Sequence, residues 1–295
     1  VDKPKTVAYS RDFMGPSSAT LQMRNIVPKI LDSDIPNIRE NYTVTDKADG
    51  MRKLLIIADD GKIYLIDTNM SVQFTGLRCG NKKYHGSILD GEHILHGKNK
   101  NFINLYAVFD IYFVGDKDIR KLPFIPIKIA PSTSSASSND ARLPQLIAAI
   151  RNLEIEPVKG VSTPMRIEAK SFYSTSDSQS IFQACAVVLT REKDGLFEYN
   201  TDGLIFTPAN LGVGADSVKD TDMPKNRKVT WRHSFKWKPP EYNTIDFLVS
   251  VDKEENGTDT IHNIFQPGTD ASSATQLTQY KTLKLRVGYD EKRHG

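Results

Sequence analysis

Residues 45–52 read Thr-Asp-Lys-Ala-Asp-Gly-Met-Arg and predict a lysine, Lys47, in a turn between two β-strands. The glycine at position 50 allows the bend, and the apolar run at 53–58 favours a strand covered on both faces. A lysine amine is a nucleophile only when it is unprotonated, which burial or nearby cations favour. Taken alone, the segment is explained more simply by a solvated lysine beside an ordinary Asp-Gly turn. The rest of the chain decides between these interpretations.

The composition is that of an ordinary soluble globular protein, with 39% hydrophobic and 25% charged residues over 295 positions. The formal net charge of +3 permits a polyanionic partner without requiring one. Cys79 and Cys185 have no metal or redox spacing and fit a reducing compartment. No apolar run is long enough to span a membrane, and no secretion signal is seen. We expect a cytoplasmic protein that is not secreted and, since it begins with Val1, a piece of a longer polypeptide.

Strand and turn signals predict a mainly antiparallel sheet. Hairpin-type connections join the strands after the lysine turn, the first at residues 59–61. Flexible loops are expected at 130–140 and 210–227, where turn-forming residues accumulate. Strands are predicted at 53–58, 62–67, 87–95, 104–114, 165–172, 202–206, 231–238, 245–251 and 282–287.

Three helices are predicted from serine caps and from apolar residues at helical spacing. A short one is expected over residues 17–26, and a second over 141–152. The third, over 178–190, would bury Ile181, Cys185, Val188 and Leu189.

Five short blocks follow one another along the chain, and each alone is a weak signal. They are Lys47-Ala48-Asp49-Gly50-Met51-Arg52, Asp90-Gly91-Glu92, Phe109-Asp110, Asp202-Gly203-Leu204-Ile205-Phe206 and Phe235-Lys236-Trp237-Lys238. Their order and spacing resemble the covalent nucleotidyltransferases, the superfamily of mRNA capping guanylyltransferases and ATP-dependent polynucleotide ligases. The resemblance covers residues 15–251, most of the chain.

The residue types in these blocks also suit attack on the α-phosphate of a nucleotide. Such an attack needs an unprotonated amine in line with a pyrophosphate leaving group. Lys236 and Lys238 share one face of a strand and can neutralise phosphate charge. The carboxylates of Glu92 and Asp202 suit Mg²⁺, which prefers oxygen ligands. The ring of Phe109 offers a stacking face for a base.

The resemblance implies a role for each residue around the nucleoside. Lys47 would form the covalent lysyl–nucleotide intermediate through its Nζ. Arg52 and Glu92 would contact the ribose, and Phe109 would stack on the base. Standing alone, Glu92 also fits a solvated strand-end acid, and Phe109 also fits a core residue. The sequence leaves open whether Lys170 faces the pocket.

The resemblance also implies a metal site and a phosphate site. Asp202 would bind Mg²⁺ or Mn²⁺ together with Glu92 and Asp246. Lys236 and Lys238 would contact the α-phosphate.

The segment after the fifth block is similar to capping enzymes, in which the chain passes quickly into an OB domain. Gly15-Pro16 is similar to the opening of capping enzymes of large cytoplasmic DNA viruses. We therefore expect an mRNA guanylyltransferase that transfers GMP from GTP, through a lysyl-GMP intermediate, to the 5′-diphosphate end of RNA. The alternatives are an ATP-dependent DNA or RNA ligase acting through lysyl-AMP and a non-catalytic nucleotide- or RNA-binding module.

The resemblance implies an α+β fold with an ATP-grasp-like nucleotidyltransferase domain, made of antiparallel sheets with flanking helices, over residues 1–243. Residues 244–295 would begin an OB fold, a five-stranded barrel that we expect to be incomplete in this sequence. The family's sixth block, a basic Arg-x-Asp-Lys-type element that orients the pyrophosphate, is not found in the sequence. Triphosphatase and methyltransferase modules are expected on the same or an associated chain, and a viral protein would act in a viral factory or virion.

Overall fold

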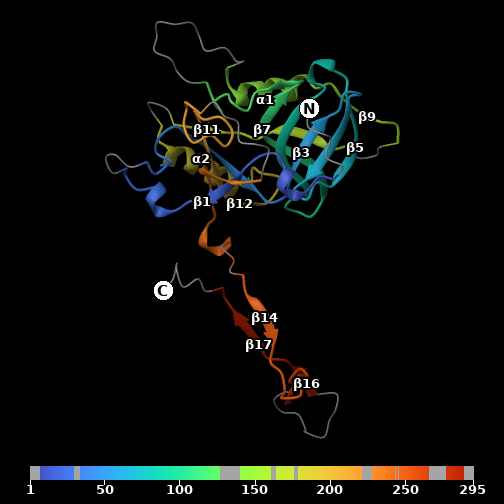
Figure 1. The fold of residues 1–295 in the computed structure, drawn as a ribbon, viewed down its shortest axis with the longest axis vertical. Helices are drawn as coiled ribbons and strands as arrows, with labels where there is room; N and C mark the ends of the chain where they lie inside the picture. The colour runs from blue at the N-terminus through green and yellow to red at the C-terminus, as the bar shows by residue number, and fades with distance from the viewer. Residues whose placement is uncertain are drawn as a thin grey trace. The chain divides into compact units, whose positions relative to one another are not determined.

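The chain forms two compact units, Val1–Glu241 and Tyr242–Gly295. The first unit contains the lysine segment and two β-sheets (Figure 1). A computed structural model of the protein describes residues 7–29, 34–126, 140–160, 164–175, 179–220, 228–242, 244, 246–265 and 277–288.

The smaller sheet of the first unit contains five strands in the described ranges, in the order β1-β13-β12-β2-β11. Most neighbours pair antiparallel, but β1 pairs in parallel with β13. Val44, Leu204, Phe206 and Phe235 from this sheet are buried in one core cluster. Its strands are β1 (Ser17–Thr20), β2 (Tyr42–Ala48), β11 (Tyr173–Ser174), β12 (Thr201–Pro208) and β13 (Thr230–Trp237).

The larger sheet contains eight strands in the same part of the chain, in the order β10-β7-β6-β3-β4-β5-β9, with β8 beside β7. Its neighbours pair antiparallel except β10 and β7, which are parallel. Its strands are β3 (Met51–Ile57), β4 (Lys62–Asp67), β5 (Val72–Cys79), β6 (Ile88–His96), β7 (Phe102–Val114), β8 (Lys117–Asp118), β9 (Ile155–Pro157) and β10 (Arg166–Ala169).

The lysine segment connects the two sheets. Strand β2 of the smaller sheet ends at Ala48, and β3 of the larger sheet begins at Met51. Asp49 and Gly50 form the whole connection between them. The prediction that Lys47 lies in the turn itself is wrong, because Lys47 is part of β2 and only Asp49 and Gly50 form the turn. The tight crossing places Lys47 at the boundary between the sheets.

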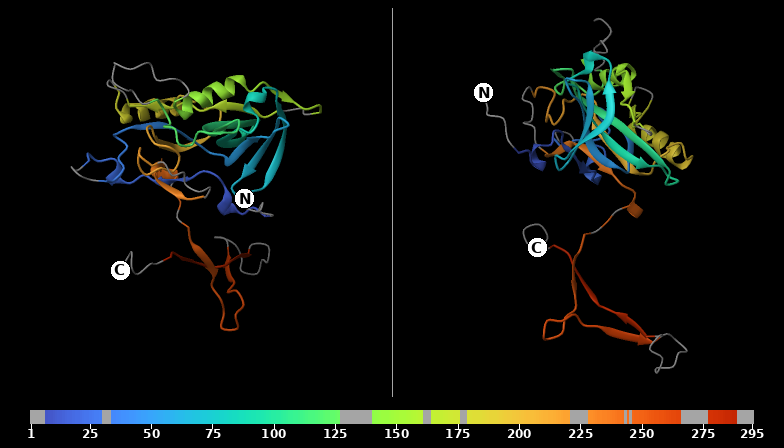
Figure 2. Two further views of the ribbon diagram at one scale, coloured as in Figure 1. Left: turned by 45° about the horizontal axis from the view of Figure 1, so that its top comes forward. Right: turned by 90° about the vertical axis from the view of Figure 1, so that its right-hand side faces the viewer.

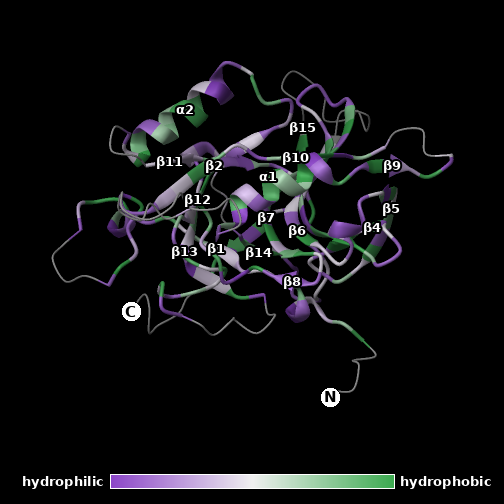
Figure 3. Cartoon of the chain, turned by 90° about the horizontal axis from the view of Figure 1, so that it is seen from above, coloured by the Kyte–Doolittle hydropathy of each residue, from purple (hydrophilic) through white to green (hydrophobic). Residues whose placement is uncertain are grey.

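A helix packs on each sheet in the described residues. Helix α1 (Arg142–Asn152) buries Leu146 and Ala149 in the core cluster of the larger sheet. Helix α2 (Ile181–Lys193) packs against β2 and begins at the side-chain cap Ser180. Both helices lie along the same side of the first unit (Figure 2), and both mix hydrophobic and hydrophilic residues (Figure 3), as surface helices do. None of the described helices has the length and apolar character needed to cross a membrane.

The predicted antiparallel architecture with flanking helices is confirmed. Most predicted strands correspond to observed ones, and the helix at 141–152 corresponds to α1. The third predicted helix overlaps α2, although residues 176–178 lie outside the described ranges. Its predicted stripe is wrong at Leu189, which is exposed, whereas Ala184 is buried. The strand predicted over 165–172 is too long, because β10 ends at Ala169.

The helix predicted over residues 17–26 is wrong. Strand β1 occupies its first part, and Met23–Asn25 forms a short 3-10 turn. Ser18 Oγ lies 2.7 Å from Ser234 Oγ, and the Leu21 amide donates to the Lys236 carbonyl oxygen. Pairing with a strand 216 residues away in sequence therefore overrides the local preference, which is a weak determinant.

The second unit contains two antiparallel strand pairs in its described residues. A five-stranded barrel is not formed by these strands, so the expected partial OB fold is not confirmed. Strand β14 (Leu248–Val251) pairs with β17 (Leu283–Arg286), and β15 (His262–Phe265) pairs with β16 (Leu277–Tyr280).

Candidate active site

Gly50 allows the lysine turn to pack directly against β6. A side chain here would place its Cβ 2.8 Å from Glu92 Cγ and 2.9 Å from the His93 carbonyl oxygen. Such contacts are too short for any Cβ, so a larger residue would push the turn away from β6. Glycine therefore brings Lys47 at the end of β2 close to Glu92 on β6.

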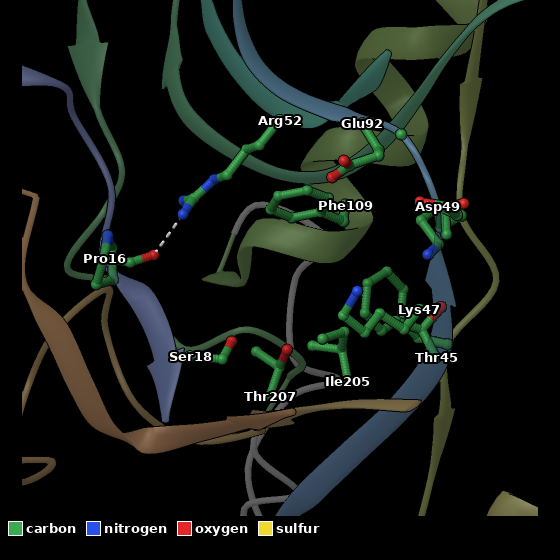
Figure 4. Close-up of a pocket in the computed structure, with 14 residues that line it drawn as sticks. Pro16, Ser18, Thr45, Lys47, Asp49, Arg52, Glu92, Phe109, Ile205 and Thr207 are labelled. Atoms are coloured by element: carbon green, nitrogen blue, oxygen red, sulfur yellow. Dashed lines mark hydrogen bonds between the residues drawn. The ribbon is translucent and has the colours of Figure 1, made fainter. Parts of the chain in front are cut away.

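A pocket with a cavity volume of about 190 Å³ lies beside Lys47. In Figure 4, Arg52 and Phe109 lie on the wall formed by the larger sheet, and Ile205 and Thr207 lie opposite them. Both sheets, the N-terminal segment and the stretch before β11 supply the lining: Pro16, Ser18, Thr45, Lys47, Ala48, Asp49, Gly50, Arg52, Glu92, Phe109, Lys170, Phe172, Ile205 and Thr207.

Asp202 joins two lysines at the edge of this pocket. Lys47 Nζ donates to Asp202 Oδ1 at 2.7 Å, and Lys238 Nζ lies 2.7 Å from Oδ2. Burial opposes ionisation of Asp202, but the hydrogen bonds from Lys238 and Lys47 outweigh it and lower its pKa. Gly203 has a φ of +140°, and a Cβ there would overlap the Trp237 carbonyl oxygen. The close approach of β12 and β13 at this glycine brings Lys238 within reach of Asp202.

Arg52 is held in a buried network on the opposite wall. Its Nε and Nη2 donate to the two carboxylate oxygens of Asp90 at 3.0 and 2.5 Å, and its Nη1 donates to the Pro16 carbonyl oxygen at 2.7 Å. The Tyr112 hydroxyl donates to the same carboxylate at 2.5 Å. Burial alone would lower the pKa of Arg52, but the ion pair with Asp90 raises it. Arg52 is therefore a fixed cation at the pocket wall.

Glu92 lies directly opposite Arg52 in the β3–β6 register and lines the pocket. Burial raises the pKa of its carboxyl group to about 7; the nearby Lys170 opposes this rise, and Asp90 adds to it. The group therefore changes its charge near neutral pH. In its charged form it can hold a cation or accept hydrogen bonds from hydroxyl groups.

Phe109 reaches the pocket through a β-bulge. Asp90 pairs with Asp110 and Gly91 pairs with Val108, so Phe109 is an extra residue on β7. A bulge of this kind breaks the alternation of a strand and turns one side chain in a new direction. The sequence signal that could have indicated this bulge is Gly91 within β6, since an isolated glycine in a strand often marks one.

Lys170, which the sequence left open, lines the pocket. Its Nζ donates to the Asp46 carbonyl oxygen at 2.5 Å and lies 2.9 Å from Asp46 Oδ2. The Tyr199 hydroxyl donates to the same carboxylate at 3.1 Å. Lys170 is thus a buried, oriented donor, and a lysine ahead of the fourth block was its only sequence signal.

Two other predicted site residues, Lys236 and Asp246, are not among the described residues that line the pocket. Lys236 is exposed on β13 directly opposite Ile205, and opposite residues share a face, so it points to the pocket side of the smaller sheet. Asp246 is exposed and belongs to the second unit, and its metal role stays a prediction. Within the described residues, no group of three or more His, Cys, Asp and Glu side chains could hold a metal. Asp202 and Glu92 are the two predicted carboxylate ligands in the first unit.

The site combines a lysine amine, nearby cations and an aromatic ring on the opposite wall. A nucleotidyl-transferring enzyme uses side chains of these kinds. Residues 30–221 match the family model described as mRNA capping enzyme, catalytic domain. The chain belongs to this family. The resemblance inferred from the five blocks is therefore confirmed.

Two curated relatives support the family. The chain is 27% identical over 272 residues to a probable mRNA-capping enzyme of Acanthamoeba polyphaga mimivirus, an alignment covering 82% of this chain and 22% of the relative. It is 29% identical over 228 residues to the mRNA-capping enzyme subunit alpha of Schizosaccharomyces pombe, covering 72% of this chain and 49% of the relative. The chain thus spans about a fifth of the first relative and about half of the second.

Solved structures of DNA ligases show a distant likeness. A mycobacterial DNA ligase D complexed with ATP and MES is 10% identical, with a TM-score of 0.43 over 81% of this chain and 62% of that chain. The ligase domain from M. tuberculosis LigD is 12% identical, with a TM-score of 0.42 over 88% of this chain and 69% of that chain. The family assignment rests on the family model and not on these structures.

Proposed function

We propose that this domain is an mRNA guanylyltransferase in which Lys47 is the nucleophile. Lys47 Nζ attacks the α-phosphorus of GTP; the N–P bond forms, the bond to the bridging oxygen breaks, and pyrophosphate and one amine proton leave. A terminal phosphate oxygen of the 5′-diphosphate RNA then attacks the same phosphorus; the N–P bond breaks, the Lys47 amine takes up a proton as it leaves, and the RNA carries a 5′–5′ triphosphate cap. The observation that carries this proposal is the 2.7 Å hydrogen bond from Lys47 to Asp202 at the edge of a pocket lined by Arg52, Glu92 and Phe109.

Asp202 orients the amine of Lys47 before attack. A side chain with four rotatable bonds has many conformations, and one strong hydrogen bond selects among them. Lys238 shares the carboxylate and, together with Lys236, supplies positive charge where the phosphates would lie. These groups lower the barrier mainly by position and charge.

The larger-sheet wall binds the nucleoside. Phe109 stacks on the base, since aromatic rings accept any base face and contribute about 1–3 kcal/mol per stack. Arg52 and Glu92 contact the ribose from their fixed positions on β3 and β6. Lys170 offers an oriented ammonium donor on the same pocket lining.

The carboxylates of Asp202 and Glu92 fit a hard divalent cation such as Mg²⁺ or Mn²⁺. Mg²⁺ keeps several waters and binds through one or two carboxylates plus substrate phosphates, so a cage of protein ligands is not needed. When bound, the ion supplies charge neutralisation at the phosphate oxygens.

The acceptor of the GMP is RNA with a 5′-diphosphate end. Such an end is the product of a triphosphatase, and the finished cap is the substrate of a methyltransferase. We therefore infer that modules with these activities act with this domain, on the same chain or an associated one, in the cytoplasm. The family and the two capping-enzyme relatives support this inference.

The test is to incubate the chain with α-labelled GTP or ATP and a divalent metal. The expected result is label on the protein from GTP only, stable to base and labile to acid, as a phosphoramidate is. Label from ATP would favour the ligase alternative, and no label from either nucleotide would favour a non-catalytic binding module.

A further inference from the structure

A buried arginine outside the pocket is joined to both aromatic side chains that line it. Arg142 is the first residue of α1, and its side chain is completely buried. Charged side chains are rarely buried to this extent unless their partners are fixed. The arginine does not line the pocket, and no sequence motif includes it.

The first connection runs through Asp110 to Phe109. Arg142 Nε donates to Asp110 Oδ1 at 2.9 Å, and its Nη2 donates to Oδ2 at 3.2 Å. The Ile111 amide donates to the same Oδ1 at 2.8 Å. Asp110 follows the extra residue Phe109 in the bulge, so this carboxylate fixes one side of the bulge. Arg142 thereby holds the backbone that directs the Phe109 ring.

The second connection runs through Phe124 to Phe172. The guanidinium carbon of Arg142 lies 5.5 Å from the centre of the Phe124 ring, within cation–π range. Phe124 packs edge-on against Phe172, with ring centres 4.8 Å apart at 70°. Phe172 and Phe109 are the two aromatic side chains in the described pocket lining.

The remaining donors of Arg142 fix two more segments. Its Nη1 donates to the carbonyl oxygens of Leu122 and, at 3.1 Å, Leu211. A planar guanidinium can satisfy these acceptors and a carboxylate together, whereas an ammonium group cannot reproduce that geometry.

We propose that Arg142 is a positioning residue for the nucleotide base, because its guanidinium holds both aromatic side chains of the pocket from behind. This inference rests on the proposed function, in which the base stacks in this pocket. Arg142 touches neither base nor phosphate, so its loss changes affinity for the base and leaves the phosphate contacts of the lysines in place.

The test compares the wild-type chain with Arg142→Lys, which keeps the charge and loses the planar donor set. GTP and inorganic tripolyphosphate are titrated in parallel by calorimetry. Removing a whole stack would weaken binding by about ten- to a hundredfold, so misplacing it should weaken GTP binding by about three- to tenfold. Tripolyphosphate affinity and the rate of adduct formation at saturating GTP should stay within about twofold.

Leu146→Ala is the matched control for a general loss of stability. Leu146 lies one turn along the same helix and is completely buried in a core cluster that includes neither Phe109 nor Phe124. Its truncation should lower the melting temperature without changing GTP affinity. If Arg142→Lys does not fold, Asp110→Asn replaces it with the same expected loss of GTP affinity.

Three results would overturn the positioning role of Arg142 or separate it from the proposed guanylyltransferase activity. Unchanged GTP affinity in a folded Arg142→Lys chain would overturn the positioning role, as would an equal loss in Leu146→Ala. A wild type that binds GTP more tightly than Arg142→Lys but forms no lysyl adduct would support the positioning role and overturn the proposed guanylyltransferase.

Discussion

The two walls of the pocket hold their charged groups in different ways. On the smaller sheet, Lys47 and Lys238 share Asp202, and their side chains are 22% and 34% exposed. On the larger sheet, the Arg52 side chain is also 22% exposed, but two hydrogen bonds clamp it to Asp90, which is completely buried, whereas Asp202 is 14% exposed. Partly exposed ion pairs exchange partners at little cost, whereas buried pairs do not. The reactive groups therefore lie where a substrate can rearrange them, and the binding groups are fixed before it arrives.

The largest effect is expected from a substitution at Asp202 on the smaller-sheet wall, where the reactive lysines lie. Asp202→Asn removes the charge that orients Lys47 and Lys238, so the rate of adduct formation at saturating GTP should fall roughly a hundredfold or more. GTP affinity should change by less than about threefold, since the base and ribose contacts lie on the other wall. Quench-flow labelling and calorimetry measure the two quantities.

Asp216→Asn is the control, because Asp216 is 60% exposed and pairs with Arg232 on the surface. Its adduct rate should equal that of the wild type. A full adduct rate in Asp202→Asn would contradict the division of labour between the walls.

The next largest effect is expected from a substitution at Phe109 on the larger-sheet wall, where the nucleoside would bind. Phe109→Ala should weaken GTP binding by about ten- to a hundredfold, because one base stack is lost. Phe102→Ala, a truncation of an exposed ring on the same strand, should leave binding unchanged. Equal GTP affinity in Phe109→Ala and the wild type would mean that Phe109 serves the core alone.

A smaller effect, on stability, tests how rigidly the Arg52–Asp90–Tyr112 hydrogen-bond network is packed. Gly15 has a φ of +108°, and a Cβ there would lie 2.6 Å from Tyr112 Oη and 2.8 Å from Arg52 Nη2. Gly160 has a similar φ of +97° with nothing within 4 Å. Gly15→Ala should therefore lose about 1–3 kcal/mol more stability than Gly160→Ala in urea titrations, the difference being the clash with the network. Equal losses of unfolding free energy in Gly15→Ala and Gly160→Ala would show that the network rearranges at little cost.

An effect of similar size is a pH dependence at Glu92. Its pKa of about 7 in the folded protein lies above the ordinary value of 4.5, so the folded protein keeps a proton that the unfolded chain has released. Its contribution to stability therefore falls as pH rises from 4.5 to about 7 and is constant above that range. Glu92→Gln removes this dependence and should gain about 2–3 kcal/mol relative to wild type between about pH 5 and pH 8.

Urea titrations at several pH values measure this change. The exposed Glu156→Gln serves as control and should run parallel to the wild type. A pH-independent difference between Glu92→Gln and the wild type would contradict the assigned titration.

The sequence predicted the features that depend on local pattern. The turn at Asp49 and Gly50, the hairpins after it and helix α1 follow from alternation, turn residues and helical spacing, although Lys47 itself lies in β2. The five blocks also predicted the family, because their order is specific even though each is weak. Lys47, Arg52, Glu92 and Phe109 all line one pocket, as a shared site requires.

The features that the sequence did not predict depend on distant partners. Ser17–Thr20 forms a strand because β13 is beside it, and no local signal reports that partner. The bulge at Phe109 is a mismatch between two strands; Gly91 in β6 hints at an irregularity, but it does not show which residue of β7 is the extra one. Arg142 belongs to no motif, and its relation to the pocket exists only through the folded chain.

The most direct test of the account is to locate the modified residue. The chain is incubated with GTP and metal, digested, and mapped by mass spectrometry beside Lys47→Ala and Lys47→Arg. The account predicts GMP on Lys47 in the wild type and no adduct in either variant, although both still bind GTP, because a guanidinium stays protonated and cannot attack. GMP on Lys170, Lys236 or Lys238, or an adduct in either variant, would contradict it.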